Sequence, residues 1–310
     1  MTTKRLWILG AEDSEMDEIE WILQTAGETV LYACVGADRV TQDNAYQTTS
    51  VQWPPNMRIA ESMHNTLATS DIITVECKMA KDYTFPEISQ RIDHHGIGDF
   101  GFDLPPEKYR EASSIGQVLL RLHEQYEFAY EPRKHGDGYR HYLTAEGAKP
   151  IELPEEFENI AALDHCLSAA YKGQCPGIDL RLLISQRVRD KARQQDQEDI
   201  EVLNDINGAL VVITTVLSQH GHIYDGVVDL RNRGVIPEIE EASWQSGIAV
   251  LLTTPPKEGS LDRHRKVSLI GASMDQVNAF LANDFCPELT AKYGYPFRGC
   301  AEGYITPKGA

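Results

Sequence analysis

Short apolar runs alternate with amphipathic segments through the first half of the chain. Residues 6–9, 30–35 and 72–76 have the length and composition of buried strands. Residues 16–26 place apolar side chains at helical spacing, and residues 58–67 repeat that spacing. Strands and helices in alternation predict an α/β fold with a parallel sheet.

The same alternation continues through the middle of the chain. Residues 91–92 predict a short strand, and helical periodicity recurs in residues 113–126 and 155–171. Between these two helices, residues 131–149 are rich in glycine and histidine, which predicts an excursion loop or a hairpin.

A long polar segment separates this half from the rest. Residues 180–204 have helical character but carry charges all round, which is typical of a connector between domains. We therefore place an N-terminal parallel-sheet domain at residues 1–185, a connecting helix at 186–205, and a smaller mixed α/β domain at 206–310.

The last third of the chain carries the elements of this smaller domain. Strand-like runs occur at residues 210–216, 248–253 and 266–270. A helix is predicted over residues 274–281, and a glycine-rich loop over residues 293–303.

The net charge of the chain limits the kinds of molecule that it is expected to bind. The 310 residues are 42% hydrophobic and 25% charged, which is ordinary for a soluble globular protein. The net charge of −18 argues against binding to long nucleic acid or to an anionic membrane, because both require positive surfaces. A small anionic substrate held by a local basic pocket or by metal ions is compatible with this charge.

The cysteine content and the lengths of the apolar runs indicate the cellular compartment. The six cysteines form no C-x-x-C pair and are too sparse for a disulfide scaffold, which indicates reduced thiols in a cytoplasmic protein. The N-terminal apolar run is too short for a signal peptide, and the longest apolar run, residues 208–217, is too short to span a bilayer.

Acidic residues and histidines follow the predicted strands, where α/β enzymes keep their sites. One further acid, Asp164, lies on the apolar stripe of its predicted helix, where a carboxylate needs a metal ion or an arginine as partner. Ordinary roles at a helix N-terminus or a solvated strand end would also explain some of these positions. The candidates are Asp13, Glu15, Glu76, Asp93, His94, His95 and Asp164.

Carboxylate oxygens and imidazole nitrogens are the ligands that suit Mn²⁺ or Mg²⁺. Two such ions about 3.5–4 Å apart activate a water molecule and neutralise a phosphoryl group. The pattern therefore predicts a centre of one or two divalent ions.

The order of these positions resembles that of the DHH phosphoesterase superfamily. The third motif of that family is unaltered in Asp93-His94-His95. The first motif, His-x-x-x-Asp-x-Asp, is similar to residues 9–15, with Leu9 in place of the histidine and Glu15 in place of the second aspartate.

The resemblance implies a role for each candidate. Asp93 would orient His94, and His95 would face the scissile phosphate, which a metal-activated water attacks. Because Leu9 cannot bind metal, we expect one tightly held ion with a second held weakly, or a single ion. His165 is a candidate replacement for the missing ligand, although helix geometry points it about 100° away from Asp164. The implied metal ligands are Asp13, Glu15, Glu76, His94 and Asp164.

The second domain is similar to the DHHA1 domain of the same superfamily. Residues 266–269 read K-V-S-L, and residues 294–303 keep the glycine spacing of the family's substrate loop. The implied substrate-binding residues are Arg298, Gly299 and Arg265. Arg298 in a solvated loop, and Arg265 in a surface cluster that offsets nearby acids, are the ordinary alternatives.

The resemblance implies a metal-dependent phosphoesterase that hydrolyses a small phosphorylated substrate: a nucleotide, a cyclic dinucleotide or a short oligonucleotide. A pyrophosphatase of the same class is the first alternative. A catalytically idle relative that binds a nucleotide or a protein partner is the second, and Leu9 favours it. An ordinary α/β binding module with coincidental acids is the third.

Overall fold

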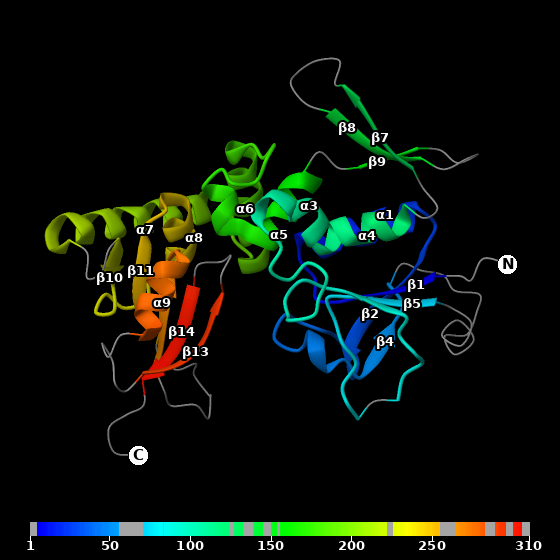
Figure 1. Ribbon diagram of the computed structural model, residues 1–310, viewed down its shortest axis with the longest axis horizontal. Helices are drawn as coiled ribbons and strands as arrows, with labels where there is room; N and C mark the ends of the chain where they lie inside the picture. The colour runs from blue at the N-terminus through cyan, green and yellow to red at the C-terminus, as the bar shows by residue number, and fades with distance from the viewer. Residues whose placement is uncertain are drawn as a thin grey trace. The chain divides into compact units, whose positions relative to one another are not determined.

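The computed structural model describes residues 5–55, 71–82, 84–123, 127–132, 139–144, 150–153, 156–221, 226–254, 265–282, 289–295 and 300–305. The chain divides into two compact units, Met1–His165 and Cys166–Ala310. The division falls inside α5 (Phe157–Tyr171), at Cys166, whose φ of −152° and ψ of 51° are not helical. Each unit combines helices with a β-sheet (Figure 1), so the predicted α/β class is confirmed.

Unit 1 is built on a six-stranded sheet with the strand order β3-β2-β1-β5-β6 and with β4 beside β2. Strands β2, β1, β5 and β6 run parallel, whereas β3 and β4 are antiparallel to β2. The four parallel strands therefore present their carboxyl ends along one edge. The strands are β1 (Arg5–Leu9), β2 (Thr29–Val35), β3 (Asp38–Arg39), β4 (Ser50–Gln52), β5 (Asp71–Val75) and β6 (Gln90–Ile92).

Buried apolar side chains explain the central strands and the first helix. All five residues of β1 are buried, as expected for a strand covered on both faces. Helix α1 (Ser14–Thr25) begins at its N-cap Asp13, whose side chain accepts a hydrogen bond from the main-chain N–H of Met16. Its buried face carries the predicted spacing, with Met16, Ile19, Ile22 and Leu23.

The rest of unit 1 consists of short helices and a small sheet. The predicted excursion, residues 131–149, overlaps a hairpin of β7 (Glu127–Pro132) and β8 (Tyr139–Thr144), which β9 (Ile151–Glu152) extends into a three-stranded sheet. The short helices are η1 (Ala45–Gln47), η2 (Pro106–Lys108), α3 (Tyr109–Ala112) and α4 (Ser114–Leu122). The helix predicted over residues 58–67 lies outside the described residues.

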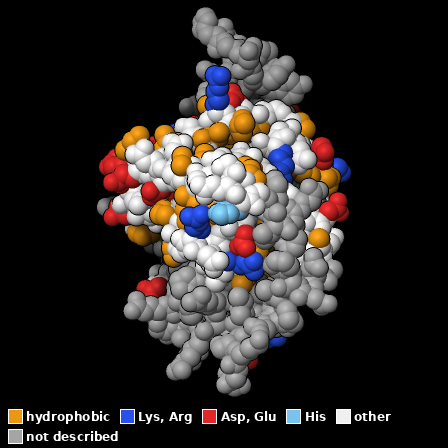
Figure 2. All heavy atoms as spheres, turned by 90° about the vertical axis from the view of Figure 1, so that its left-hand side faces the viewer, with side chains coloured by type: hydrophobic (Ala, Val, Ile, Leu, Met, Phe, Trp, Pro, Cys, Tyr) orange, Lys and Arg blue, Asp and Glu red, His pale blue; other side chains and the backbone are white. Residues whose placement is uncertain are grey.

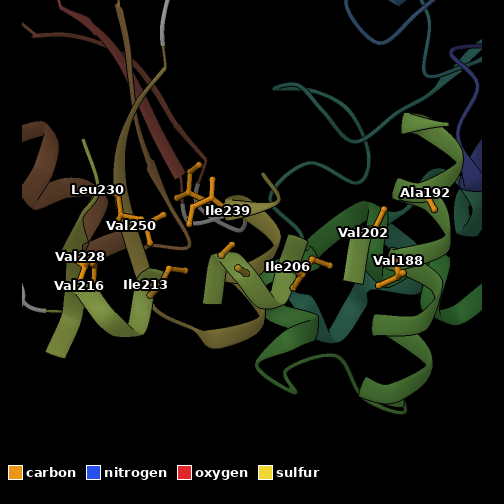
Figure 3. Packing of buried hydrophobic residues seen from close by; sticks show 13 residues of the cluster. Val188, Ala192, Val202, Ile206, Ile213, Val216, Val228, Leu230, Ile239 and Val250 are labelled. Carbon is orange, nitrogen blue, oxygen red and sulfur yellow. The ribbon is translucent and has the colours of Figure 1, made fainter. Parts of the chain in front are cut away.

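Unit 2 has a five-stranded sheet with the order β10-β11-β12-β14-β13, in which β10 and β11 are parallel and the other pairs antiparallel. Helices α6, α7 and α8 pack apolar residues against this sheet (Figure 3). The elements are α6 (Leu180–Gln195), α7 (Asp199–His220), β10 (Val227–Asp229), α8 (Ile239–Ser246), β11 (Ala249–Thr254), β12 (Arg265–Ile270), α9 (Met274–Ala282), β13 (Leu289–Tyr295) and β14 (Cys300–Ile305).

Two predictions for unit 2 were wrong. Residues 210–216 belong to helix α7 and not to a strand. Short runs rich in β-branched residues fit either element by periodicity, and here the helix is revealed by its buried residues at spacings of three and four: Val202, Ile206, Ala209, Ile213 and Val216. The described part of the predicted loop over residues 293–303 lies in β13 and β14.

The polar segment predicted as one connecting helix contains two helices. Asp196, with a φ of 53° and a ψ of 47°, ends α6, and a capping box between Glu198 and Glu201 begins α7. Val188 and Ala192 of α6 pack in the same core as α7. Residues 166–185, which the sequence places in the N-terminal domain, group with unit 2.

Among the described helices, α7 alone is long and apolar enough, by length and composition, to cross a membrane. The predicted apolar run of residues 208–217 is only the middle of this 22-residue helix. One face of α7 packs into the core of unit 2. Figure 2, which views the left-hand side of Figure 1, shows hydrophobic side chains scattered among polar ones on that side, with acidic side chains toward its outline.

Candidate metal centre

The carboxyl edge of the parallel sheet in unit 1 carries most of the predicted site residues. Asp13 and Glu15 follow β1, Glu76 follows β5 directly, and the Asp93-His94-His95 sequence follows β6 directly. The carboxyl ends of parallel strands are where α/β proteins place their ligand sites. The strand order β1-β5-β6 brings these three loops side by side.

Four side chains at this edge converge closely enough to share one cation. Glu76, His94, His95 and Asp164 each offer one ligand atom, and the four atoms lie within 4.8 Å of one another. His94 Nε2 lies 3.1 Å from Asp164 Oδ2, and His94 Nδ1 lies 3.8 Å from Glu76 Oε1. Carboxylates with imidazoles in one shell are a donor set for Mn²⁺ and related divalent ions.

Asp93 holds the ring of His95. Its Oδ1 accepts hydrogen bonds from the main-chain N–H groups of His94 (2.8 Å) and His95 (3.0 Å) and lies 3.0 Å from His95 Nδ1. Its Oδ2 accepts a hydrogen bond of 2.9 Å from the hydroxyl of Tyr46. Burial acts to raise the pKa of Asp93, but the hydrogen bonds from His95 and Tyr46 outweigh it and hold the pKa at about 2.

The resemblance predicts that Asp93 orients His94. The ring that it hydrogen-bonds is that of His95, and the two imidazoles stack with their centroids 4.2 Å apart. His95 has a side-chain exposure of 36%, against 4% for His94. His95 is therefore the member of the group that meets solvent.

Negative charge accumulates around the group of four. Burial, followed by the charge of Glu76, raises the pKa of Asp13 to about 7. Burial, followed by the charge of Asp164, raises the pKa of Glu15 well above its usual value, and the same causes raise the pKa of Glu76. Carboxyl groups in this state are stabilised by an added positive charge, so the residues present fit a divalent cation.

The N-terminus of α4 supports two of these carboxylates. The hydroxyl of Ser114 donates a hydrogen bond of 2.7 Å to Glu76 Oε1, and the main-chain N–H of Ile115 donates one of 2.8 Å to Glu15 Oε1. The positive end of the helix dipole favours carboxylates at this position. We did not predict Ser114 or Tyr46 as site residues. Ser113 and Ser114, directly before an apolar helix, are a sequence signal for a helix cap and could have indicated Ser114. Tyr46 lies in a polar stretch that carries no such signal.

The loops approach one another too closely for larger side chains at two glycines. A Cβ at Gly10 would come within 2.5 Å of the carbonyl oxygen of Glu76. A Cβ at Gly101 would come within 2.0 Å of the carbonyl oxygen of Ala112 and 2.6 Å of the Cβ of His94. Glu76 itself has a φ of 50°, a strained conformation for this residue and one that is often found at functional sites.

The chain was compared with protein-family models, curated proteins and solved structures. No protein-family model matches the chain, and no curated protein matches it. A solved structure to which the chain is similar is the pGpG-specific phosphodiesterase PggH from Vibrio cholerae. The match covers 98% of this chain and 93% of that chain, with 9% sequence identity and a TM-score of 0.40.

The remaining predicted residues lie in different places. Asp13 and Glu15 are outside the group of four but close enough for its charges to raise their pKa values. Arg265 begins β12 and pairs in register with Ile305 of β14, so it belongs to unit 2. Arg298 and Gly299 lie outside the described residues.

Leu9 and His165 bear on the missing histidine of the first motif. Leu9 is fully buried at the end of β1 and offers no ligand atom. His165 Nε2 lies 2.9 Å from the carbonyl oxygen of Leu104, and its ring meets that of His94 edge-on with centroids 5.6 Å apart. His165 thus lies beside the group of four without belonging to it.

Proposed function

We propose that this chain is a metal-dependent phosphoester hydrolase of the DHH type that acts on a small phosphorylated substrate. The observation that carries the proposal is the convergence of Glu76, His94, His95 and Asp164 within 4.8 Å. These residues would hold a divalent ion, Mn²⁺ or Mg²⁺. Such an ion neutralises phosphoryl charge and activates water.

The side chains around this group have distinct tasks under the proposal. Asp93 fixes the ring of His95 through Nδ1, so that Nε2 would face the ion and the phosphate bound to it. Since His95 is the exposed member of the group, a phosphate arriving from solvent meets it first. Asp13 and Glu15 would serve as further ligands or hold a second ion more weakly, because Leu9 removes a donor from that side.

The chain's charge supports a small substrate. With a net charge of −18, the protein repels a long polyanion, and neutralisation of only a few phosphates is expected. Arg298 and Arg265 are the proposed phosphate-binding residues of the second unit. We expect hydrolysis of oligonucleotides to fall steeply with length and to depend only weakly on salt.

A second candidate function is binding without catalysis. The observation that favours it is Leu9, which is buried where a histidine ligand stands in the DHH motif. A relative that has lost one metal ligand can retain its substrate pocket and still bind a nucleotide or a protein partner.

One experiment separates the two functions. Mononucleotides, cyclic dinucleotides, short oligonucleotides and inorganic pyrophosphate are incubated with the full-length protein, with and without Mn²⁺, and metal content is measured on the same sample. Hydrolysis that requires Mn²⁺ and disappears in Asp164→Asn supports the hydrolase. If the protein binds metal and nucleotide but turns over no substrate, the result supports binding without catalysis.

A further inference from the structure

The turn that follows the Asp93-His94-His95 sequence holds two large apolar side chains in solvent. Ile97 is 93% exposed and Phe100 is 62% exposed. Single apolar residues on a surface are common, but a pair on one turn beside a polar site calls for an explanation.

Hydrogen bonds within the turn hold it in one shape. The main-chain N–H of Gly96 donates 2.8 Å to Asp99 Oδ2, and the N–H of Asp99 donates 3.0 Å to the carbonyl oxygen of Gly96. Arg91 forms an ion pair with the Asp99 carboxylate, which is only 4% exposed. The exposure of Ile97 and Phe100 is therefore imposed by a braced turn.

Contacts at its far end fix the turn against the site. Gly101 packs so closely on His94 and Ala112 that no Cβ fits there. His165 Nε2 lies 2.9 Å from the carbonyl oxygen of Leu104, which ties the end of the segment to α5.

Chain geometry places the main chain of this turn at the margin of the group of four. Ile97 is two residues from His95, so their Cα atoms are at most about 7.6 Å apart. Phe100 precedes Gly101, which contacts His94. This margin, formed by residues 95–100, therefore carries one exposed imidazole and two exposed apolar side chains.

We propose that Ile97 and Phe100 form a platform for the aromatic base of a nucleoside phosphate whose phosphate lies at Glu76, His94, His95 and Asp164. This inference rests on the proposed function and narrows its substrate class. A ligand with a charged end and a flat apolar end matches this margin. Inorganic pyrophosphate and sugar phosphates have no aromatic face to stack on the two side chains.

The size of the apolar surface also favours a small ligand over a protein. Two side chains fall far short of the roughly 800 Å² that each partner contributes to a stable protein interface. Stacking of a base on an aromatic side chain needs only one exposed ring.

A binding experiment tests the platform without requiring turnover. Calorimetry compares AMP with ribose 5-phosphate, which carries the same phosphate without a base, on full-length protein with Mn²⁺. We expect Phe100→Ala to weaken AMP binding by roughly 5- to 100-fold and to leave ribose 5-phosphate unchanged, with Ile97→Ala acting in the same direction. Leu120→Ala, which removes a 59% exposed side chain from α4, is the matched control and should change neither.

Kinetics separate a failure of the platform from a failure of the proposed hydrolase. For a dinucleotide substrate, Phe100→Ala should raise KM with kcat nearly unchanged, and hydrolysis of inorganic pyrophosphate should not respond. Turnover that is equally fast in Phe100→Ala and in the parent, with equal AMP affinity, overturns the platform alone. Absence of turnover for every substrate overturns the hydrolase, while AMP binding that depends on Phe100 would still support the platform. A change in self-association on Phe100→Ala, with AMP affinity unchanged, would assign the turn to a protein contact and overturn the inference.

Discussion

Buried acidic side chains occur in both units, but the acids of the candidate metal centre in unit 1 are neutralised differently from Glu241 of unit 2. In unit 2, Glu241 is fully buried and accepts hydrogen bonds from Arg187 Nε at 2.8 Å and from the hydroxyl of Tyr171. In unit 1, Glu76 and Asp164 pair with histidines, and no lysine or arginine in the described part of the chain reaches either carboxylate.

This difference shows which acids are part of the folded scaffold and which require something from outside the chain. A buried carboxylate beside an arginine is already neutralised, and losing either partner is costly. Buried carboxylates packed against one another raise each other's pKa, and a divalent cation relieves that repulsion. We therefore expect substitutions in the two clusters to change stability in opposite directions.

The largest effect is expected for Glu241→Ala in unit 2. The substitution leaves Arg187 largely buried without its carboxylate, which should lower the free energy of unfolding by about 3 kcal/mol. Chemical denaturation in metal-free buffer and in Mn²⁺ provides the measurement, and the loss should be equal in both. A loss below about 0.5 kcal/mol would show that the pair behaves as an exposed surface bridge.

Glu15→Gln should act in the opposite sense in unit 1. The amide keeps the hydrogen bond from the Ile115 N–H and is uncharged without taking up a proton on folding, so the metal-free protein should gain about 1 kcal/mol of stability. The stabilisation by added Mn²⁺ should shrink in the same variant. Thermal unfolding with and without Mn²⁺ measures both changes, and a destabilised metal-free variant would contradict the proposed repulsion.

The pH dependence of stability sharpens the comparison. Because the pKa of Asp13 is raised to about 7, the folded protein retains a proton there that the unfolded chain releases near pH 4. The free energy of unfolding of the metal-free protein should therefore fall as the pH rises from about 4 to about 7, and the raised pKa values of Glu15 and Glu76 act in the same direction.

Asp13→Asn isolates this contribution, since the amide can still cap α1. The variant should lose less stability than the parent between pH 5 and pH 8 in metal-free thermal unfolding. Mn²⁺ should stabilise the parent more at pH 8 than at pH 5, because the ion replaces the proton. Identical pH profiles for the two proteins would remove Asp13 from the cluster.

The smallest effect is expected for Tyr46→Phe. The substitution removes one hydrogen bond from the Asp93 carboxylate and raises its pKa, but leaves the bonds from His94 and His95 in place. Since Tyr46 is 40% exposed, we expect only a roughly fivefold fall in kcat, with KM and Mn²⁺ affinity nearly unchanged. Because the pKa of Asp93 rises, the acidic limb of the pH profile of kcat should move to higher pH. A change confined to thermal stability would make Tyr46 a purely structural residue.

The parallel sheet and the edge that carries the site were predictable from the sequence, because buried strands and the acids that follow them have clear local signals. The apolar runs before Asp13, Glu76 and Asp93 indicated both the strands and where they end. Helix α7 was not predictable from the sequence. A run of β-branched residues fits a strand as well as a buried helix face until the spacing of its buried residues is known.

Contacts between residues far apart in the sequence were also not predictable from it. The hydrogen bond from Ile115 to Glu15 joins residues 100 positions apart, and Tyr46 reaches Asp93 across 47 positions. The pattern indicated which residues are acidic, but only the packing of α4 on the sheet edge determines which main-chain donors they meet.

The central claim is that the group of Glu76, His94, His95 and Asp164 binds a divalent cation. The most direct test is calorimetric titration of Mn²⁺ into the metal-free full-length protein, its Asp164→Asn and His94→Ala variants, and Asp71→Asn as a control. Asp71 begins β5, at the opposite end of that strand from Glu76. We predict saturable Mn²⁺ binding that weakens at least about tenfold in the two site variants and is unchanged in the control. Equal affinity in all four proteins, or no binding to the parent, would contradict the account.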